Sequence, residues 1–158
     1  LASAAGAREV ALERFFLATR KTALAPGEVL ARVRIPLPGP ATRFGVYKLA
    51  KRFDQDISAV CGAFAIELDG DTIVAARVAY GGMAATPRRA PGAEGVLAGR
   101  PWSLATIEAA MAALDADFRP IDDFRASARY RRLAARNLLL RFYRSGLGDG
   151  PTQVAAYG

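Results

Sequence analysis

Alternating apolar and polar positions predict five β-strands in the first half of the chain. The candidates share this period of two and have turn residues near their ends: residues 8–16, 28–36, 42–51, 58–68 and 73–80. The sequence Asp69-Gly70-Asp71 separates the last two by a spacing typical of a hairpin turn, so we expect these strands to pair antiparallel. In the last strand, Val74, Val78 and Tyr80 would share one face.

A period of about 3.6 residues replaces the alternation in the second half and predicts helices. Ser103 and Ser127 are placed to cap two helices that end near Asp117 and Ser145. A shorter helix is expected over residues 87–97. The apolar face of the last helix is expected to contain five residues: Tyr130, Leu133, Ala134, Leu138 and Phe142.

The clearest boundary in the chain is Leu37-Pro38-Gly39-Pro40, because two prolines around a glycine cannot continue a β-ladder. The order of elements predicts an α+β fold. A three-stranded antiparallel sheet would pack against C-terminal helices, and a short strand segment would precede it. The expected divisions are residues 1–40 with the linker, a domain over residues 41–148, and a flexible tail over residues 149–158.

The composition removes several kinds of chemistry. Cys61 is the single cysteine and there is no histidine, so an intrachain disulfide, a Ser-His-Asp relay and an ordinary zinc or iron–sulfur site have no ligands or partners here. A lone cysteine suits a reducing, cytoplasmic compartment. No apolar run approaches the ~20 residues of a membrane span. A chain opening on Leu1 is expected to be a piece of a longer protein.

The net charge of +7 leaves nucleic acid, a membrane surface or an acidic subunit as formal partners. Seven arginines gather in and just before the last predicted helix, but they are spread around it and no aromatic residues interleave as stacking platforms. We therefore favour a solvated or subunit-facing surface, with neither nucleic acid nor membrane as partner. The seven are Arg125, Arg129, Arg131, Arg132, Arg136, Arg141 and Arg144.

The most informative stretch is residues 47–60, where a strand with Lys48 leads through an acidic turn into a buried strand. A lysine beside a cofactor can offer a charged donor to a carbonyl or phosphate. Asp56 can accept backbone N–H groups and fix the loop. On residue types alone, a solvated lysine and a turn-capping aspartate are the simpler interpretation.

Residues 48–60 resemble the opening of the C-terminal flavoprotein domain of molybdenum hydroxylases, a family that includes xanthine dehydrogenase, aldehyde oxidase and carbon monoxide dehydrogenase. The version at residues 53–57 is most similar to the flavin and iron–sulfur subunit of bacterial xanthine dehydrogenases. Together, the matching strings cover about nine-tenths of the chain. The others, in order, are residues 15–28, 34–36, 81–90, 122–127 and 130–131.

The resemblance implies part of an oxidoreductase with purine-hydroxylating chemistry. In the parent enzyme, a molybdopterin centre would oxidise xanthine or hypoxanthine, 2Fe-2S clusters would carry the electrons to FAD, and NAD would accept a hydride. Leu30 matches the family's leucine against the flavin ring, and Lys48 matches its flavin-binding lysine. Asp56 is expected to shape the neighbouring loop. Arg20 lies in a matching string without an assigned contact.

The FAD site would be partial. The family's glycine-rich segment, which cradles the FAD pyrophosphate, precedes the matching strings, and Gly81-Gly82 corresponds instead to a turn. The remainder would come from the N-terminal iron–sulfur and FAD portion of the same subunit. A molybdopterin-binding large subunit would complete a dimer of heterodimers. The isolated chain is expected to be non-catalytic. A non-enzymatic subunit-docking module is the alternative interpretation, and a nucleic-acid binder is the least favoured.

Overall fold

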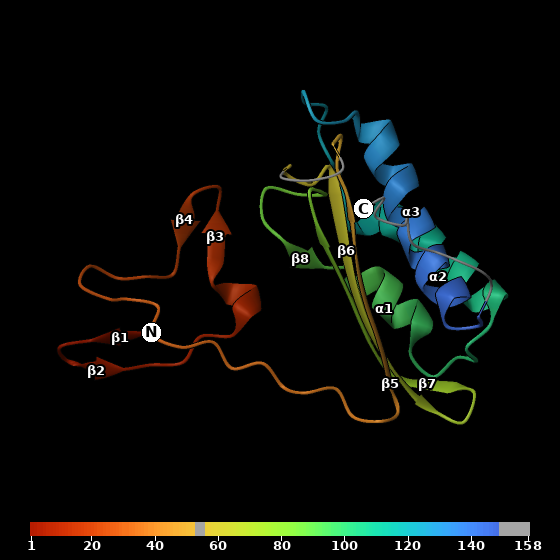
Figure 1. Cartoon of the computed structure of the whole chain (residues 1–158), viewed down its shortest axis with the longest axis horizontal. Coiled ribbons are helices and arrows are strands. Elements are labelled where there is room, and N and C mark those ends of the chain that lie inside the picture. Colours follow the sequence, from red (N-terminus) through yellow and green to blue (C-terminus); the bar gives the residue numbers. More distant parts are fainter. Residues whose placement is uncertain (53–55, 149–158) are drawn as a thin grey trace, which may run out of the picture.

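The computed structural model describes residues 1–52 and 56–148, which form two regions (Figure 1). The predicted tail, residues 149–158, lies outside the described residues, as do positions 53–55 of the informative loop. We call residues 1–40 the arm. It carries short elements only: β1 (Ala2–Ser3), β2 (Gly6–Ala7), the 3₁₀ turn η1 (Leu12–Arg14), β3 (Phe16–Ala18) and β4 (Lys21–Thr22).

The second region, residues 41–148, is an antiparallel sheet covered by helices, and we call it the sheet–helix domain. Its strands lie in the order β5-β6-β7-β8, so β5 is an edge strand of this chain. Its elements are β5 (Thr42–Leu49), β6 (Val60–Asp69), β7 (Thr72–Gly81), β8 (Arg88–Arg89), α1 (Pro91–Leu97), α2 (Leu104–Asp117) and α3 (Ala128–Ser145). The predicted α+β fold is confirmed, with β8 added to the three expected strands.

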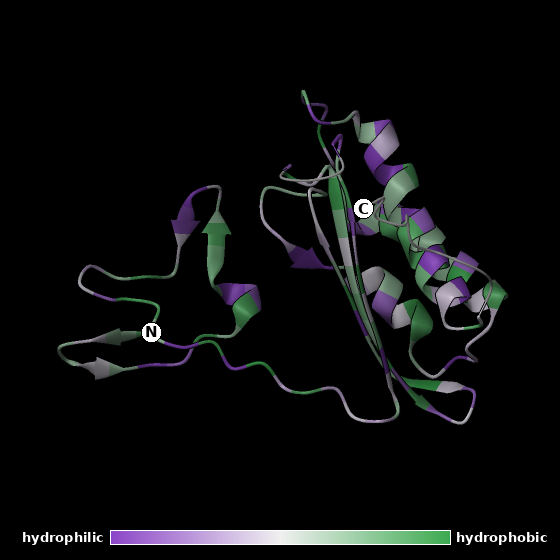
Figure 2. Cartoon of the chain, in the orientation of Figure 1, coloured by the Kyte–Doolittle hydropathy of each residue, from purple (hydrophilic) through white to green (hydrophobic). Residues whose placement is uncertain are grey.

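The hydrophobic core lies between the sheet and the three helices, which pack on one side of it (Figure 1). Alternate residues of β6 are buried against the helices: Val60, Gly62, Phe64 and Ile66. Hydrophobic residues dominate α2, whereas hydrophilic residues are frequent along α3 (Figure 2). The alternating residues of β6 therefore point to opposite faces of the sheet, one buried against the helices and one not.

Local signals set the turns and caps as expected. The hairpin between β6 and β7 turns at Gly70, whose φ of 56° suits glycine. The side chains of Ser103 and Ser127 accept the backbone N–H of Thr106 and Tyr130 and so cap α2 and α3. No helix within the described ranges is long and apolar enough to cross a membrane.

A β-bulge overturns the predicted facing of Val74, whereas Val78 and Tyr80 share the buried face of β7 as predicted. Glu67 pairs with Ala75 and Leu68 with Ile73, so the pairing skips Val74. A bulge inserts one extra residue and reverses which side chains point inward. As a result Ile73 is fully buried and Val74 is 52% exposed, contrary to the sequence-based assignment.

Two arm strands predicted from alternation are also wrong. Residues 28–36 form only an isolated bridge between Val29 and Ala2, and residues 8–16 contain η1 and only the first residue of β3. Every residue of the arm, all of it described, is at least partly exposed. Alternation needs a neighbouring strand to make a ladder, and residues 30–40 pair with none in the described chain.

Two helix predictions need adjustment. The helix expected over residues 87–97 begins at Pro91, because Arg88 and Arg89 pair with β7 as β8. On α3, Tyr130 and Leu133 are largely exposed, whereas Arg131 is only 3% exposed. The buried face continues through residues 131, 134, 135, 138 and 142 at helical spacing, so an arginine takes an inward position.

Candidate functional site

No helix among the described residues covers the face of the sheet that points away from α1, α2 and α3. Phe44 and Val46 of β5 are exposed on it, and Lys48 follows them on the same side. Small residues make the neighbouring strands flat there: Cys61, Ala63, Ala65, Ala79 and Gly81. Register places Lys48 opposite Cys61, and Cys61 opposite Gly81, so these three form one row across the sheet.

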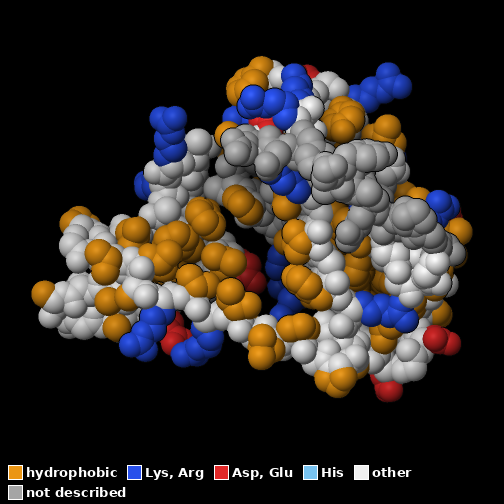
Figure 3. All heavy atoms as spheres, in the orientation of Figure 1, with side chains coloured by type: hydrophobic (Ala, Val, Ile, Leu, Met, Phe, Trp, Pro, Cys, Tyr) orange, Lys and Arg blue, Asp and Glu red, His pale blue; other side chains and the backbone are white. Residues whose placement is uncertain are grey.

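Lys48 and Leu30 stand on different regions of the molecule. The arm lies on the side of the sheet away from the helices (Figure 1). A space-filling view shows an opening between the two regions, bordered by hydrophobic side chains together with basic and acidic ones (Figure 3). Lys48 belongs to the open sheet face. Leu30 belongs to the arm, and 53% of its surface is exposed. The two predicted residues therefore lie on regions that face one another across an opening.

The backbone before Leu30 is held in place by the arm's own contacts. Val29 and Ala2 exchange two backbone hydrogen bonds of 2.9 and 3.0 Å. Glu28 accepts two hydrogen bonds from Arg8, of 2.6 and 2.7 Å, and another from the N–H of Ala25. These contacts, with the Arg8 side chain first, lower the pKa of Glu28 to about 2. The backbone is therefore fixed up to the residue that precedes Leu30.

Asp56 has the predicted loop-shaping geometry. Its carboxylate accepts the backbone N–H groups of Arg52, at 3.2 Å, and Ile57, at 2.9 Å. These hydrogen bonds, the one from Arg52 first, lower the pKa of Asp56. Lys51 anchors the start of the same loop by donating to the carbonyl of Phe124 at 2.5 Å. The loop after Lys48 is therefore tied both internally and to residues near α3.

Arg131 is a functional candidate that the sequence analysis did not single out. It reaches inward from α3, and one terminal nitrogen donates to the carbonyls of Ala59, at 2.5 Å, and Gly82, at 2.7 Å. The other donates to Asp123 at 2.6 Å. Gly82 must be glycine here, because it has a φ of 79° and a Cβ would collide with the carbonyl of Ala59. One side chain thus joins three segments.

Asp123 completes this arrangement from the segment before α3. Its carboxylate also accepts the N–H groups of Arg125 and Ala126. The backbone bond from Ala126 is the largest cause that lowers the pKa of Asp123, and Arg131 adds to it. Asp123 therefore meets Arg131 as a carboxylate, within the segment whose Phe124 carbonyl receives Lys51.

An ion pair also links the arm to the sheet–helix domain. Glu94 of α1 accepts the N–H of Val78 and two hydrogen bonds from Arg89, all at 2.8 Å. These bonds hold the Arg89 guanidinium, whose NH1 lies 3.7 Å from Glu13 on η1. This contact lies at the β8 edge of the sheet, where the arm approaches it.

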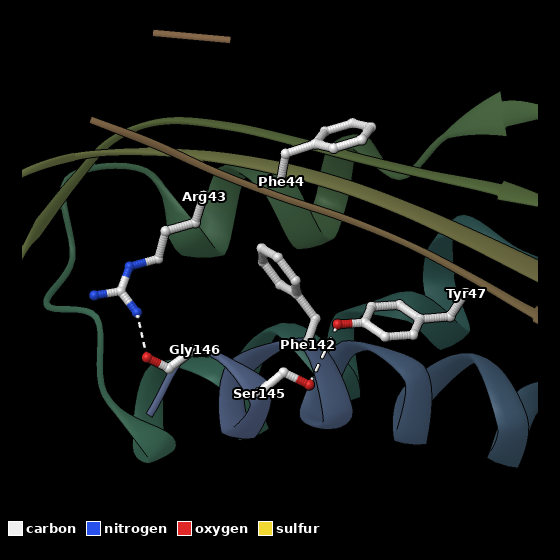
Figure 4. A pocket seen from close by; sticks show the side chains of 6 residues that line it. All are labelled: Arg43, Phe44, Tyr47, Phe142, Ser145 and Gly146. Carbon is white, nitrogen blue, oxygen red and sulfur yellow. Dashed lines mark hydrogen bonds between the residues drawn. The ribbon is translucent and has the colours of Figure 1, made fainter. Parts of the chain in front are cut away.

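A shallow pocket of about 350 Å³ lies on the helix side of β5 (Figure 4). Its polar groups are already engaged within the chain. Arg43 donates to the carbonyl of Gly146, and the Tyr47 hydroxyl bonds to Ser145. The pocket is lined by Arg43, Phe44, Tyr47, Phe142, Ser145 and Gly146. Of these residues, only Phe44 points toward the open face that carries Lys48.

The described ranges hold no group of three or more His, Cys, Asp or Glu side chains arranged for a metal. The sequence from residue 45 to 145 matches the profile of the CO dehydrogenase flavoprotein C-terminal domain. This chain belongs to that family. The matched residues include most of β5, all of β6, β7 and β8, and all three helices.

Sequence similarity to named proteins is consistent with this family. Xanthine dehydrogenase of Emericella nidulans is 32% identical over 145 residues, which cover 89% of this chain and 11% of that protein. The carbon monoxide dehydrogenase medium chain of Afipia carboxidovorans is 32% identical over 136 residues, covering 86% of this chain and 47% of that one. The chain thus spans a small part of the first relative and about half of the second.

Solved structures of the family share the fold. Carbon monoxide dehydrogenase from Hydrogenophaga pseudoflava superposes with a TM-score of 0.82 and 30% identity, over 87% of this chain and 48% of that one. Quinoline 2-oxidoreductase from Pseudomonas putida 86 gives a TM-score of 0.80 and 29% identity, over 94% of this chain and 51% of that one. The coverage shows that the matching region extends into the arm.

Proposed function

We propose that this chain is the C-terminal part of the FAD module of a xanthine dehydrogenase and lines the isoalloxazine side of the flavin site. The observation that carries the proposal is the row Lys48–Cys61–Gly81 on the open sheet face, opposite the arm that bears Leu30. Family membership supports the flavoprotein role. The choice of xanthine dehydrogenase follows from the sequence around residues 53–57 and from the relatives of that name.

The residues present suit a flavin at this face. A flat aromatic ring system needs a smooth apolar surface, and the small side chains of β6 and β7 supply one: Ala63, Ala65 and Ala79. A ring carbonyl or phosphate oxygen needs a donor, and the exposed ammonium of Lys48 can supply it. Leu30 is branched, apolar and uncovered, as a side chain that packs against the opposite side of a ring would be.

Each side chain would then have a separate task. Lys48 would bind and orient the flavin by donating to an oxygen, and its positive charge would favour electron density on the ring. Leu30 would exclude water from the ring and limit the approach of other reactants. FAD, when bound, supplies the transfer of electrons between 2Fe-2S clusters and NAD. The chain itself would contribute binding, orientation and environment.

The partners follow from the same proposal. The upstream iron–sulfur and FAD portion of the subunit would cover the arm, whose outer apolar residues Val33, Ile35 and Leu37 are mostly exposed. A molybdopterin-binding large subunit would oxidise the purine, in a dimer of heterodimers. Cys61 is a free thiol, which fits a cytoplasmic location. Alone, the chain would be non-catalytic.

The test uses the complete parent flavoprotein with Lys48→Met and Leu30→Ala. FAD content and the rate of NAD reduction by xanthine are measured for each variant. We expect Lys48→Met to lower FAD content and Leu30→Ala to alter the rate of NAD reduction. Arg132→Met is the matched control, because it removes an exposed cation from α3, on the helix side of the sheet. Unchanged values for both site variants would remove these assignments.

A subunit-docking module without flavin chemistry is the second candidate, favoured by the exposed apolar residues of the arm. FAD titration separates the two. The docking role predicts a parent flavoprotein domain that binds its partners and takes up no FAD at any concentration. The flavin role predicts FAD uptake by the parent and little or none by the isolated chain.

A further inference from the structure

We infer that Arg131 is a positioning residue for the flavin site, and this inference rests on the function proposed above. Arg131 lies on the helix side of the sheet and Lys48 on the open side. It therefore acts on the site through the backbone between them. Its role would be to fix the strand ends and the loop that set where the Lys48 ammonium stands.

The first link runs through the end of the sheet. Arg131 holds the carbonyls of Ala59 and Gly82, which directly precede β6 and follow β7. The N–H of Ala59 in turn donates to the carbonyl of Leu49 at 2.7 Å. Leu49 follows Lys48 in β5. The three strands that meet in the Lys48–Cys61–Gly81 row are thus joined, just beyond that row, through one guanidinium.

The second link runs through the loop that follows Lys48. This loop is anchored at its start, where Lys51 donates to the carbonyl of Phe124, and at its end, where Ala59 meets Arg131. Both anchors lead to one segment, because Asp123 beside Phe124 also accepts Arg131. The Arg131–Asp123 pair therefore holds the two ends of the loop at a fixed separation.

The chemistry of burial favours a geometric role over a merely stabilising one. A buried cation loses its hydration, and replacing both members of a buried ion pair with apolar side chains is often neutral or stabilising, whereas removing one member alone is destabilising. Arg131 is also incompletely satisfied, since its Nε has no partner among the described residues. The guanidinium contributes geometry, because its donors hold two backbone carbonyls and a carboxylate from three different segments in fixed positions.

The experiment measures FAD affinity and thermal stability of the complete parent flavoprotein with Arg131→Met and Arg131→Lys. The apoprotein of each variant is titrated with FAD. We expect Arg131→Met to raise the Kd for FAD on the order of tenfold, the lower end of what loss of a residue that orients a metal ligand does to metal affinity. Arg131→Lys keeps the charge but reaches fewer acceptors, so its Kd should fall between those of Arg131→Met and the unaltered protein.

Two control variants separate positioning from stability. Leu139→Ala makes a cavity in the same core two turns along α3 and should lower the Tm with little change in the Kd for FAD. Arg136→Met removes a partly exposed arginine that pairs with the partly exposed Asp115 and should change the Kd for FAD little. If Arg131→Met does not fold, Asp123→Asn weakens the same clamp from the surface and should still raise the Kd.

Two results would overturn the inference. The first is a Kd for FAD that is unaltered in the folded Arg131 and Asp123 variants while Lys48→Met raises it. The second is a rise in this Kd for Leu139→Ala that equals the rise for Arg131→Met at the same loss of Tm. Failure of the proposed function looks different, because the unaltered parent would then bind no FAD.

Discussion

The arm and the sheet–helix domain contain similar apolar patterns but reach opposite outcomes. In the domain, Phe64 and Ile66 alternate with uncovered residues and are fully buried under helices. In the arm, Val33 and Ile35 alternate as regularly, yet they are 63% and 77% exposed. Alternation of apolar and polar side chains defines which face of a strand is apolar. Burial of that face requires another segment to pack against it. For the arm, that segment is not within the described chain.

The sharpest contrast should come from apolar truncation in each region. Phe64 packs against Tyr80 and Phe142 with ring centroids 5.6 and 5.2 Å apart. We expect Phe64→Ala to lower the free energy of unfolding of this chain by about 3–5 kcal/mol. Ile35→Ala should change it by less than about 0.5 kcal/mol, as at other surface positions. Chemical denaturation followed by circular dichroism measures both.

The same pair sharpens the comparison in the parent protein. If an upstream portion covers the arm there, Ile35→Ala should become destabilising while Phe64→Ala stays so. An Ile35→Ala variant that is silent in both settings would show that the arm remains uncovered, and would count against the partner assigned to it.

A smaller effect is expected at the loop junction of the sheet–helix domain. Gly82 and Gly99 have similar φ values, 79° and 72°, but only at Gly82 would a Cβ meet backbone and the Arg131 guanidinium. Both alanine variants carry the cost of a left-handed residue, about 1–2 kcal/mol. Gly82→Ala should be clearly the more destabilising, because the Ala59 carbonyl must also move. Thermal unfolding of the two variants compares them.

Equal losses at the two glycines would contradict the close approach of Ala59, Gly82 and Arg131. Since this approach is what joins β6, β7 and α3, the result would also weaken the case for Arg131 as a positioning residue.

The smallest expected effect concerns the arm at low pH. Arg8 and the Ala25 N–H lower the pKa of Glu28 from its ordinary value of 4.5 to about 2. A lowered folded-state pKa stabilises the arm fully above about pH 4.5, and this contribution is lost as the pH falls through about 2. NMR titration of Glu28 should give the low pKa, and Arg8→Met should return it toward 4.5. An ordinary pKa in the unaltered chain would mean that the pair is not formed.

The sequence predicts those features that depend on neighbouring residues. Ser103, Ser127 and Gly70 act within a few positions of themselves, so their caps and turn follow from local chemistry. Pairing between strands is different. The bulge that turns Val74 outward depends on how β6 and β7 align, and no alternation within β7 contains that information.

The candidate site divides in the same way. Lys48 and Leu30 could be predicted only through resemblance to a family, because a lysine on a strand and an exposed leucine carry no signal of their own. Arg131 had a usable signal that apolar counting misses: it lies three and four residues before the buried Ala134 and Ala135. An arginine at an inward helical position must find acceptors, and here these come from loops distant in sequence.

The most direct test of the central claim is an experimental structure of the complete parent flavoprotein with FAD bound. Our account predicts the Lys48 ammonium about 3 Å from a flavin oxygen. It also predicts Leu30 within about 4 Å of the isoalloxazine ring. A flavin bound elsewhere, with both side chains out of contact with it and the open sheet face covered by protein alone, would contradict the account.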